Sequence, residues 1–173
     1  MNDYKGFIRD ALLKEHSKAQ TMRIVDYIGN DKLKFAALMD LFFNDVYRVN
    51  QRSAWAVSYC VRLHPELIKP YIRQMLTNLD NPVHDSVKRN TVRVLQNFNI
   101  PESLQGLAVK QCLRLLESNE PVAVKVFSIT LLGNITKQHP ELKHELKSII
   151  ETQLPYASKG FYSRAAKVLK MIQ

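Results

Sequence analysis

Few side-chain pairs in this sequence have a spacing suited to metal binding. Cys60 and His64 are four residues apart, which places two possible metal ligands on one face of a helix. Zinc requires four ligands, or three and a water, and no second Cys/His pair completes the set. His139 and His144 are five residues apart and would face different ways on a helix. We therefore expect no metal site and no cofactor, and we interpret His64 and His139 as structural residues of turns.

Catalytic motifs are absent from the sequence. It contains no phosphate-binding glycine loop, dinucleotide loop, nucleophile elbow or zinc-protease motif. Acidic pairs such as Glu141 and Glu145 fall on predicted solvent faces, whereas acid/base catalysis needs carboxylates in a desolvated cleft. We therefore expect no catalytic residue and no enzyme activity.

Trp55 allows two interpretations. Arg52 precedes it and Tyr59 follows one helical turn later, and aromatic side chains beside arginine can stack on a base or a sugar. No aspartate or glutamate occurs between Asp45 and Glu66, so no carboxylate lies near Trp55 in the sequence. Trp55 is thus a candidate aromatic contact for a ligand, or a residue that packs between helices.

Basic residues form the most suggestive pattern. Three pairs, each with a spacing of four residues, avoid the apolar stripes of their predicted helices. On stacked helices they would form a basic band across the concave face, suited to a phosphate backbone or to an acidic protein helix. The alternative is an ordinary solvated helix face, because lysine and arginine are good helix formers. The six residues are Lys69, Arg73, Lys110, Arg114, Lys143 and Lys147.

The positive charge is unevenly distributed along the chain. The formal net charge is +9. Residues 1–45 contain seven basic and seven acidic side chains, whereas residues 46–173 contain 18 basic and nine acidic ones. The whole excess therefore lies after residue 45, where it would attract a polyanion or an acidic partner, or would serve solubility alone.

Composition favours a helical protein of 173 residues. Hydrophobic residues make up 46% of the chain, and only five glycines are available for tight turns. No run of 18 apolar residues predicts a membrane span, and the first residues show no apolar signal-peptide core. Cys60 and Cys112 fall in apolar helical stretches, as reduced buried thiols do. We expect a cytoplasmic monomer.

An internal repeat of 36–39 residues runs through the sequence. The segment His64-Pro65-Glu66-Leu67 recurs 75 residues later as His139-Pro140-Glu141-Leu142, with Pro101-Glu102 between them. A second marker lies upstream of each turn, and its copies begin at Arg52, Arg89, Phe127 and Arg164, which are 37, 38 and 37 residues apart. Several markers at one period indicate an array of stacked units.

Each unit has the pattern of a helix, a turn and a second helix. Apolar residues recur at i, i+1, i+4 and i+5, and Pro65, Pro101 and Pro140 fall in first turns of helices, where proline is tolerated. Ser17, Asp31 and Asn81 are candidate caps. The pattern predicts ten helices, at residues 3–15, 17–28, 31–43, 47–63, 65–79, 83–98, 101–117, 121–138, 140–154 and 158–172.

The repeat length, the prolines that open helices and the small residues within the first helices resemble HEAT-like, armadillo-type repeats of small bacterial proteins. The resemblance covers about residues 17–173 and implies an all-α fold, an α-α superhelix of about four to five helix pairs. We expect one domain over 1–173, with a degenerate first repeat at 1–45 and a capping half-repeat at 156–173. The full repeats between them would be 46–80, 81–118 and 119–155.

The resemblance also implies the class of function. HEAT-like solenoids present long curved surfaces to protein partners, so we expect a non-enzymatic module that binds a protein partner, acidic in character, on its concave face. Nucleic-acid binding through phosphates is the second hypothesis. A DNA-repair glycosylase is the third, because one group of these enzymes is similar in design and uses a tryptophan with a nearby aspartate.

Overall fold

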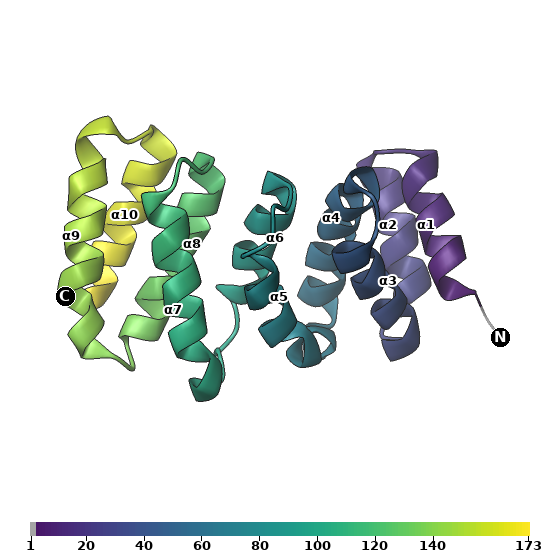
Figure 1. The fold of residues 1–173 in the computed structure, drawn as a ribbon, viewed down its shortest axis with the longest axis horizontal. Coiled ribbons are helices and arrows are strands. Elements are labelled where there is room, and N and C mark those ends of the chain that lie inside the picture. The colour runs from purple at the N-terminus through teal and green to yellow at the C-terminus, as the bar shows by residue number, and fades with distance from the viewer. Residues whose placement is uncertain (1–2) are drawn as a thin grey trace. The chain divides into compact units, whose positions relative to one another are not determined.

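Helices make up the architecture of the described part of the chain, residues 3–173, in a computed structural model (Figure 1). This part contains ten α-helices, three short 3-10 helices and no strand. The α-helices are α1 (Tyr4–Lys14), α2 (Lys18–Ile28), α3 (Lys32–Asn44), α4 (Tyr47–Leu63), α5 (Ile72–Asn78), α6 (Asp85–Leu95), α7 (Glu102–Glu117), α8 (Val122–Thr136), α9 (Lys143–Gln153) and α10 (Lys159–Ile172). The 3-10 helices are η1 (Pro65–Tyr71), η2 (Pro140–Leu142) and η3 (Leu154–Tyr156).

The predicted number of helices is confirmed, and seven of the ten begin and end within two residues of their predicted bounds. The helix predicted at 65–79 differs most, because its first seven residues form the 3-10 helix η1. Pro70 lies inside that segment and has no N–H to donate to the preceding turn, so a regular α-helix begins only at Ile72. The helix predicted at 140–154 likewise starts with a 3-10 turn, η2.

Side-chain caps confirm part of the predicted pattern. Ser17 Oγ accepts the backbone N–H of Gln20 at 3.1 Å, and Asp31 Oδ1 accepts that of Leu33 at 2.8 Å. The prediction for Asn81 was wrong, because α6 begins only at Asp85, and the Asn81 side chain instead donates to Oδ1 of Asn78. The ring nitrogen Nδ1 of His84 accepts the N–H of Ser86 at 2.9 Å, so a histidine stands at the start of α6.

The chain divides into two compact units, Met1–Val94 and Leu95–Gln173, and the boundary falls near the end of α6. In the N-terminal unit, α3 packs against α4 and α1, while α2 packs against α4. Phe35, Leu38 and Phe42 of α3 fill its core, each with at most 1% exposure.

In the C-terminal unit, α8 contacts α7, α9 and α10, and it packs far more extensively on α7 and α10 than on α9. Gly133 of α8 permits the close approach of α10, since a Cβ there would lie 3.0 Å from Cγ1 of Val168 and would also press on Met171. Leu131 and Ile129 of α8 are fully buried in the core.

A recurring type of side-chain hydrogen bond links neighbouring repeats. In each case a side-chain N–H donates to a backbone carbonyl near the end of a helix about one repeat earlier, where no intrahelical partner is available. Arg52 Nη1 donates to Leu12 O at 2.6 Å, 40 residues away. Asn134 donates to Gln96 O at 2.8 Å, and Gln153 to Leu116 O at 3.0 Å, at separations of 38 and 37.

Candidate partner-binding surfaces

The predicted basic residues of the N-terminal unit lie on the surface. Lys69 is in η1 and forms an ion pair with Glu66 at 2.7 Å. Arg73, one turn further along in α5, is exposed and forms no ion pair within the described residues. Arg73 is therefore available to an external anion, whereas Lys69 must first leave Glu66.

Lys110 and Arg114 lie one turn apart on α7. Lys110 is exposed and forms no ion pair in the described part of the chain. Arg114 is half-buried, and its Nε and Nη2 atoms donate to Oε1 of Gln111 at 3.2 and 2.8 Å. Gln111 thus holds the guanidinium of Arg114 in one orientation.

Lys143 and Lys147 of α9 line a cavity of about 380 Å³. The other wall comes from the end of α10, with Leu169 and Ile172. Lys147 lies 3.8 Å from Glu151, while Lys143 is half-buried and has no carboxylate within ion-pair distance among the described residues. The structure therefore brings these two lysines together with α10. Lys110 and Arg114 do not line this cavity, and a single face shared by all six basic residues stays a prediction.

Trp55 is half-buried and lines a smaller cavity of about 200 Å³ in the N-terminal unit. The ring of His16 approaches its edge, with the centroids 5.7 Å apart, and Tyr59 lies 6.2 Å away. The remaining lining residues are polar or basic, and no carboxylate lines the cavity: Gln51, Ser86, Arg89 and Asn90.

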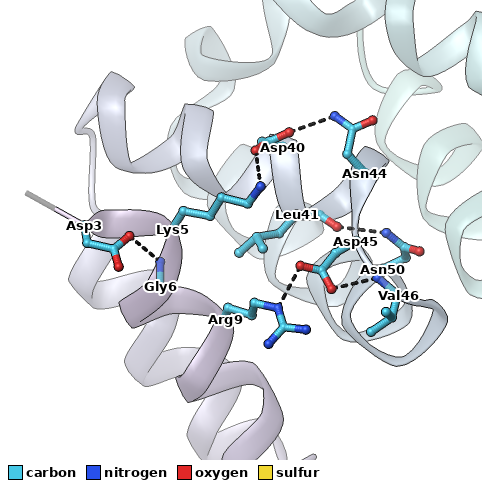
Figure 2. Close-up of polar contacts among 10 residues, drawn as sticks. All are labelled: Asp3, Lys5, Gly6, Arg9, Asp40, Leu41, Asn44, Asp45, Val46 and Asn50. Atoms are coloured by element: carbon cyan, nitrogen blue, oxygen red, sulfur yellow. Dashed lines mark hydrogen bonds and ion pairs between the residues drawn. The ribbon is translucent and has the colours of Figure 1, made fainter.

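An ion-pair network joins α1 to α3 and to the turn before α4 (Figure 2). Lys5 meets Asp40 at 2.6 Å, and Arg9 meets Asp45 at 2.8 Å. Asp45 also accepts the backbone N–H of Val46 at 2.7 Å. Sequence reasoning noted only that residues 1–45 have no net charge. A closer signal existed, because both pairs are separated by about one repeat, 35 and 36 residues.

These contacts shift the pKa values of both aspartates. Burial alone would raise the pKa of Asp45, but hydrogen bonds from Arg9 and the Val46 N–H, with the charge of Arg9, bring it below its ordinary value. The pKa of Asp40 is lowered by hydrogen bonds from Lys5 and Asn44. The charges of this network stabilise the fold internally and are not offered to a ligand.

Both cysteines are buried and unpaired, as predicted. Burial raises the pKa of the Cys60 and Cys112 thiols to about 12, so neither supplies a nucleophilic thiolate at neutral pH. Among the described residues, no group of three or more His, Cys, Asp and Glu side chains could hold a metal ion.

The histidines before the Pro-Glu turns lie at equivalent places. His64 ends α4 and precedes η1, and His139 precedes η2. His139 contacts Gln105 Oε1 through Nε2 and Glu141 through Nδ1, so it links α7 to the following turn. Of the three leucines after the turns, Leu67 and Leu104 are buried at 4% and 7% exposure, whereas Leu142 is only half-buried.

Sequence reasoning missed the exposed residues of the C-terminal unit beyond α9. Tyr156 in η3 is 92% exposed and lies at a second cavity of about 440 Å³ with Val122 and Phe161. Residues 152–173 contain four basic and no acidic side chains. The absence of acidic residues after Glu151 was a visible signal, but only the packing of α10 shows which lysines face solvent.

The comparisons with known proteins identify the family of the chain. The family model of the HEAT repeat domain matches residues 8–172, almost the whole sequence. No curated protein and no solved structure matches the chain significantly. In the described residues, no helix is long and apolar enough to cross a membrane. The helix pairs, the period of 36–39 residues and this match agree, and the chain is a HEAT repeat protein, an all-α solenoid.

Proposed function

We propose that this HEAT repeat protein is a non-enzymatic interaction module that binds an acidic protein partner through exposed basic residues on its concave face. HEAT repeats generally mediate protein interactions, and their family is typically non-enzymatic. The partner itself is to be found by experiment, and its chemistry follows from the charges on the chain.

One observation supports this proposal above the others: the excess positive charge is not neutralised within the fold. The excess lies after residue 45, and Arg73, Lys110 and Lys143 have no ion-pair partner among the described residues. Cations without partners raise the rate at which an acidic protein associates and help to select it.

Proximity labelling in the cell of origin tests this proposal. The tagged wild-type chain should label a small set of acidic proteins, and the Arg73→Glu/Lys110→Glu variant should lose at least one of them. The control is Lys18→Glu/Arg23→Glu, which makes the same charge change at two exposed residues of α2. Equal labelling by both variants would contradict the proposal.

Nucleic acid is the second candidate, favoured by the net charge of +9. Anisotropy measurements with duplex and single-stranded oligonucleotides would then show affinity falling steeply with salt, by roughly 0.9 log units per log unit of salt for each neutralised duplex phosphate, or about 0.7 for a single strand. Lys110→Glu should flatten that slope. Absence of binding at low salt would exclude this candidate.

Glycosylase chemistry has no comparable support. It requires a carboxylate beside Trp55, and the cavity at Trp55 is lined by polar and basic side chains only. We also infer a reducing, cytoplasmic location and a monomer. Two buried, unpaired thiols suit such a compartment, and size-exclusion chromatography with light scattering measures the oligomeric state directly.

A further inference from the structure

We propose that the cavity between α9 and α10, here called the α9–α10 groove, is a docking site for an acidic amphipathic segment of a protein partner. The groove is lined on the α9 side by Lys143, His144, Lys147 and Glu151, and on the α10 side by Leu169, Ile172 and Gln173. This inference rests on the proposed function, since it gives a partner-binding chain a second and more specific contact site.

The groove exists because α10 packs on α8 and hardly on α9. Gly133 of α8 admits Val168 and Met171 of α10 at close range, so the most apolar side of α10 is directed at α8. The contact between α9 and α10 is much smaller. The end of α10 therefore leaves a space of about 380 Å³ beside α9, and the apolar part of its lining, the half-buried Leu169 with Ile172, is called its floor here.

The size and floor of the groove suit an apolar side chain. Ligand pockets in proteins typically range from about 300 to 1,000 Å³ and are lined mainly by apolar groups. Leu169 and Ile172 are the two apolar residues of this lining, and the half-buried Leu169 offers more surface to a ligand than Ile172, which is 6% exposed. A bulky apolar residue of the partner would bury this floor against water, which is the principal source of affinity in helix-in-groove recognition.

The rim of the groove is basic. Lys143 and Lys147 lie one turn apart, and only Lys147 has a carboxylate nearby, Glu151 at 3.8 Å. Residues 143–173, which include α9 and α10, contain six basic and two acidic side chains. This segment therefore repels cations and attracts carboxylates. The complementary partner therefore presents glutamate or aspartate on both sides of its apolar residue.

A protein segment fits these features better than a phosphate backbone does. Phosphates would pair with the lysines, but would leave the Leu169 floor uncovered. An amphipathic helix has apolar residues at i, i+3, i+4 and i+7 with acidic residues on its flanks, and it matches both the floor and the rim. The apolar part of the groove thus favours an amphipathic protein segment over a nucleic acid as its ligand.

A titration followed by NMR tests the assignment with the full chain. The probe is a synthetic 15-residue helical peptide with leucine at i, i+3, i+4 and i+7 and glutamate at most other positions. We expect backbone and methyl shifts confined to residues 143–151 and 168–173 at low salt. A second peptide with glutamine in place of each leucine should bind at least about tenfold more weakly, because it retains only the charge contacts.

Two variants with the same charge change separate the groove from the general field of the protein. Lys143→Glu should weaken the peptide about tenfold, whereas Lys167→Glu, at an exposed residue of α10 that does not line the groove, should change binding less than twofold. Leu169→Gln should weaken binding while the thermal unfolding and the amide spectrum elsewhere stay those of the wild type. Equal weakening by Lys143→Glu and Lys167→Glu would overturn the proposal.

Three further results would also overturn it: no peptide binding at low salt, shifts centred on Lys110 and Arg114, or a single-stranded oligothymidylate that displaces the peptide and is insensitive to Leu169→Gln. The outcome is separable from that of the proposed function. Partner labelling that depends on Arg73 and Lys110 can succeed while the groove fails, and peptide binding in the groove can succeed while that labelling fails.

Discussion

Lys5 and Arg9 of α1 each meet an aspartate about one repeat later in the chain, whereas Lys110 and Lys143 of the C-terminal unit meet none within the described residues. The two regions therefore use the same residue types for different purposes. In the first 45 residues the charges are balanced, and two of the cations pair with aspartates across helices, as Figure 2 shows. After residue 45 the cations outnumber the anions two to one and lie at the surface.

The comparison indicates that the number of cations is a poor guide to a binding surface unless the cations held in internal ion pairs are left out of the count. Lys5 and Arg9 contribute to the formal charge of the chain but are held by Asp40 and Asp45. An exposed cation without an ion pair can bind an external anion without first breaking an internal contact.

The largest expected effect is the slow labelling of the cysteines by a thiol reagent. Each unit contains one buried thiol, so the two units can be compared. Cys60 reports on the N-terminal unit and Cys112 on the C-terminal unit. Burial raises both pKa values to about 12, so at pH 8 a thiol reagent reacts only after local or global unfolding. We expect protection of at least about a thousandfold relative to the denatured chain.

Mass spectrometry of the labelled peptides gives a separate rate for each cysteine. Unequal rates would mean that the two units open independently, and equal rates would mean that they open together. Rapid labelling of either cysteine at pH 8 in native buffer would contradict its burial. Cys112→Ser provides the control in which only Cys60 can react.

The next effect compares the leucines that follow the three Pro-Glu pairs in the two units. Leu67→Ala and Leu104→Ala should each lower the free energy of unfolding by about 2–5 kcal/mol, because both side chains are buried. Leu142→Ala is the matched control, and it should lower the free energy of unfolding clearly less because Leu142 is only half-buried. Denaturant titration measures all three. A loss below about 0.5 kcal/mol for Leu67→Ala would show that the η1 turn does not belong to the core.

A smaller effect tests the ion pairs of the N-terminal unit. The folded-state pKa of Asp45 is lowered, so the pair with Arg9 stabilises the fold above about pH 4 and loses its contribution as the pH falls through the folded pKa. Asp45→Asn should therefore flatten the fall of stability below pH 4. Asp26→Asn, at an exposed aspartate with no ion pair in the described residues, should leave the acid dependence unchanged.

The smallest effect is expected at the unpaired cations. Lys110→Ala should change the free energy of unfolding by no more than about 0.5 kcal/mol, since the side chain is exposed and forms no ion pair within the described part of the chain. The same titration applied to Lys5→Ala should show a larger loss, because Asp40 is then left without its partner. Equal losses would remove the distinction between paired and unpaired charges.

Sequence reasoning predicted the helices well because their signals are local. The turns at Pro65 and Pro140 and the caps at Ser17 and Asp31 depend on residues a few positions apart, and the structure confirms them. Pro101 differs from its prediction, because it stands at the N-cap before α7 and not in the first turn of that helix. The 3-10 geometry of η1 followed from Pro70 and could have been predicted. The cap at His84 could not, because its ring is positioned by Tyr47, 4.5 Å away between centroids and 37 residues earlier.

The candidate surfaces were only partly predictable for the same reason. A spacing of four places Lys143 and Lys147 on one side of their own helix, but it does not indicate which neighbour that side faces. They face α10, and the position of α10 depends on its close approach to α8 at Gly133. Whether the six basic residues share a face depends on packing that no local pattern contains.

The side-chain hydrogen bonds that link neighbouring repeats have a consequence for how the chain folds. Those from Arg52, Asn134 and Gln153 each close a loop of 37 to 40 residues. Loop-closure entropy depends only on the logarithm of loop length, so each of these closures costs nearly the same. Loop-closure entropy therefore favours none of these three contacts over the others, and we expect folding to spread from any of them by coupling between neighbouring repeats.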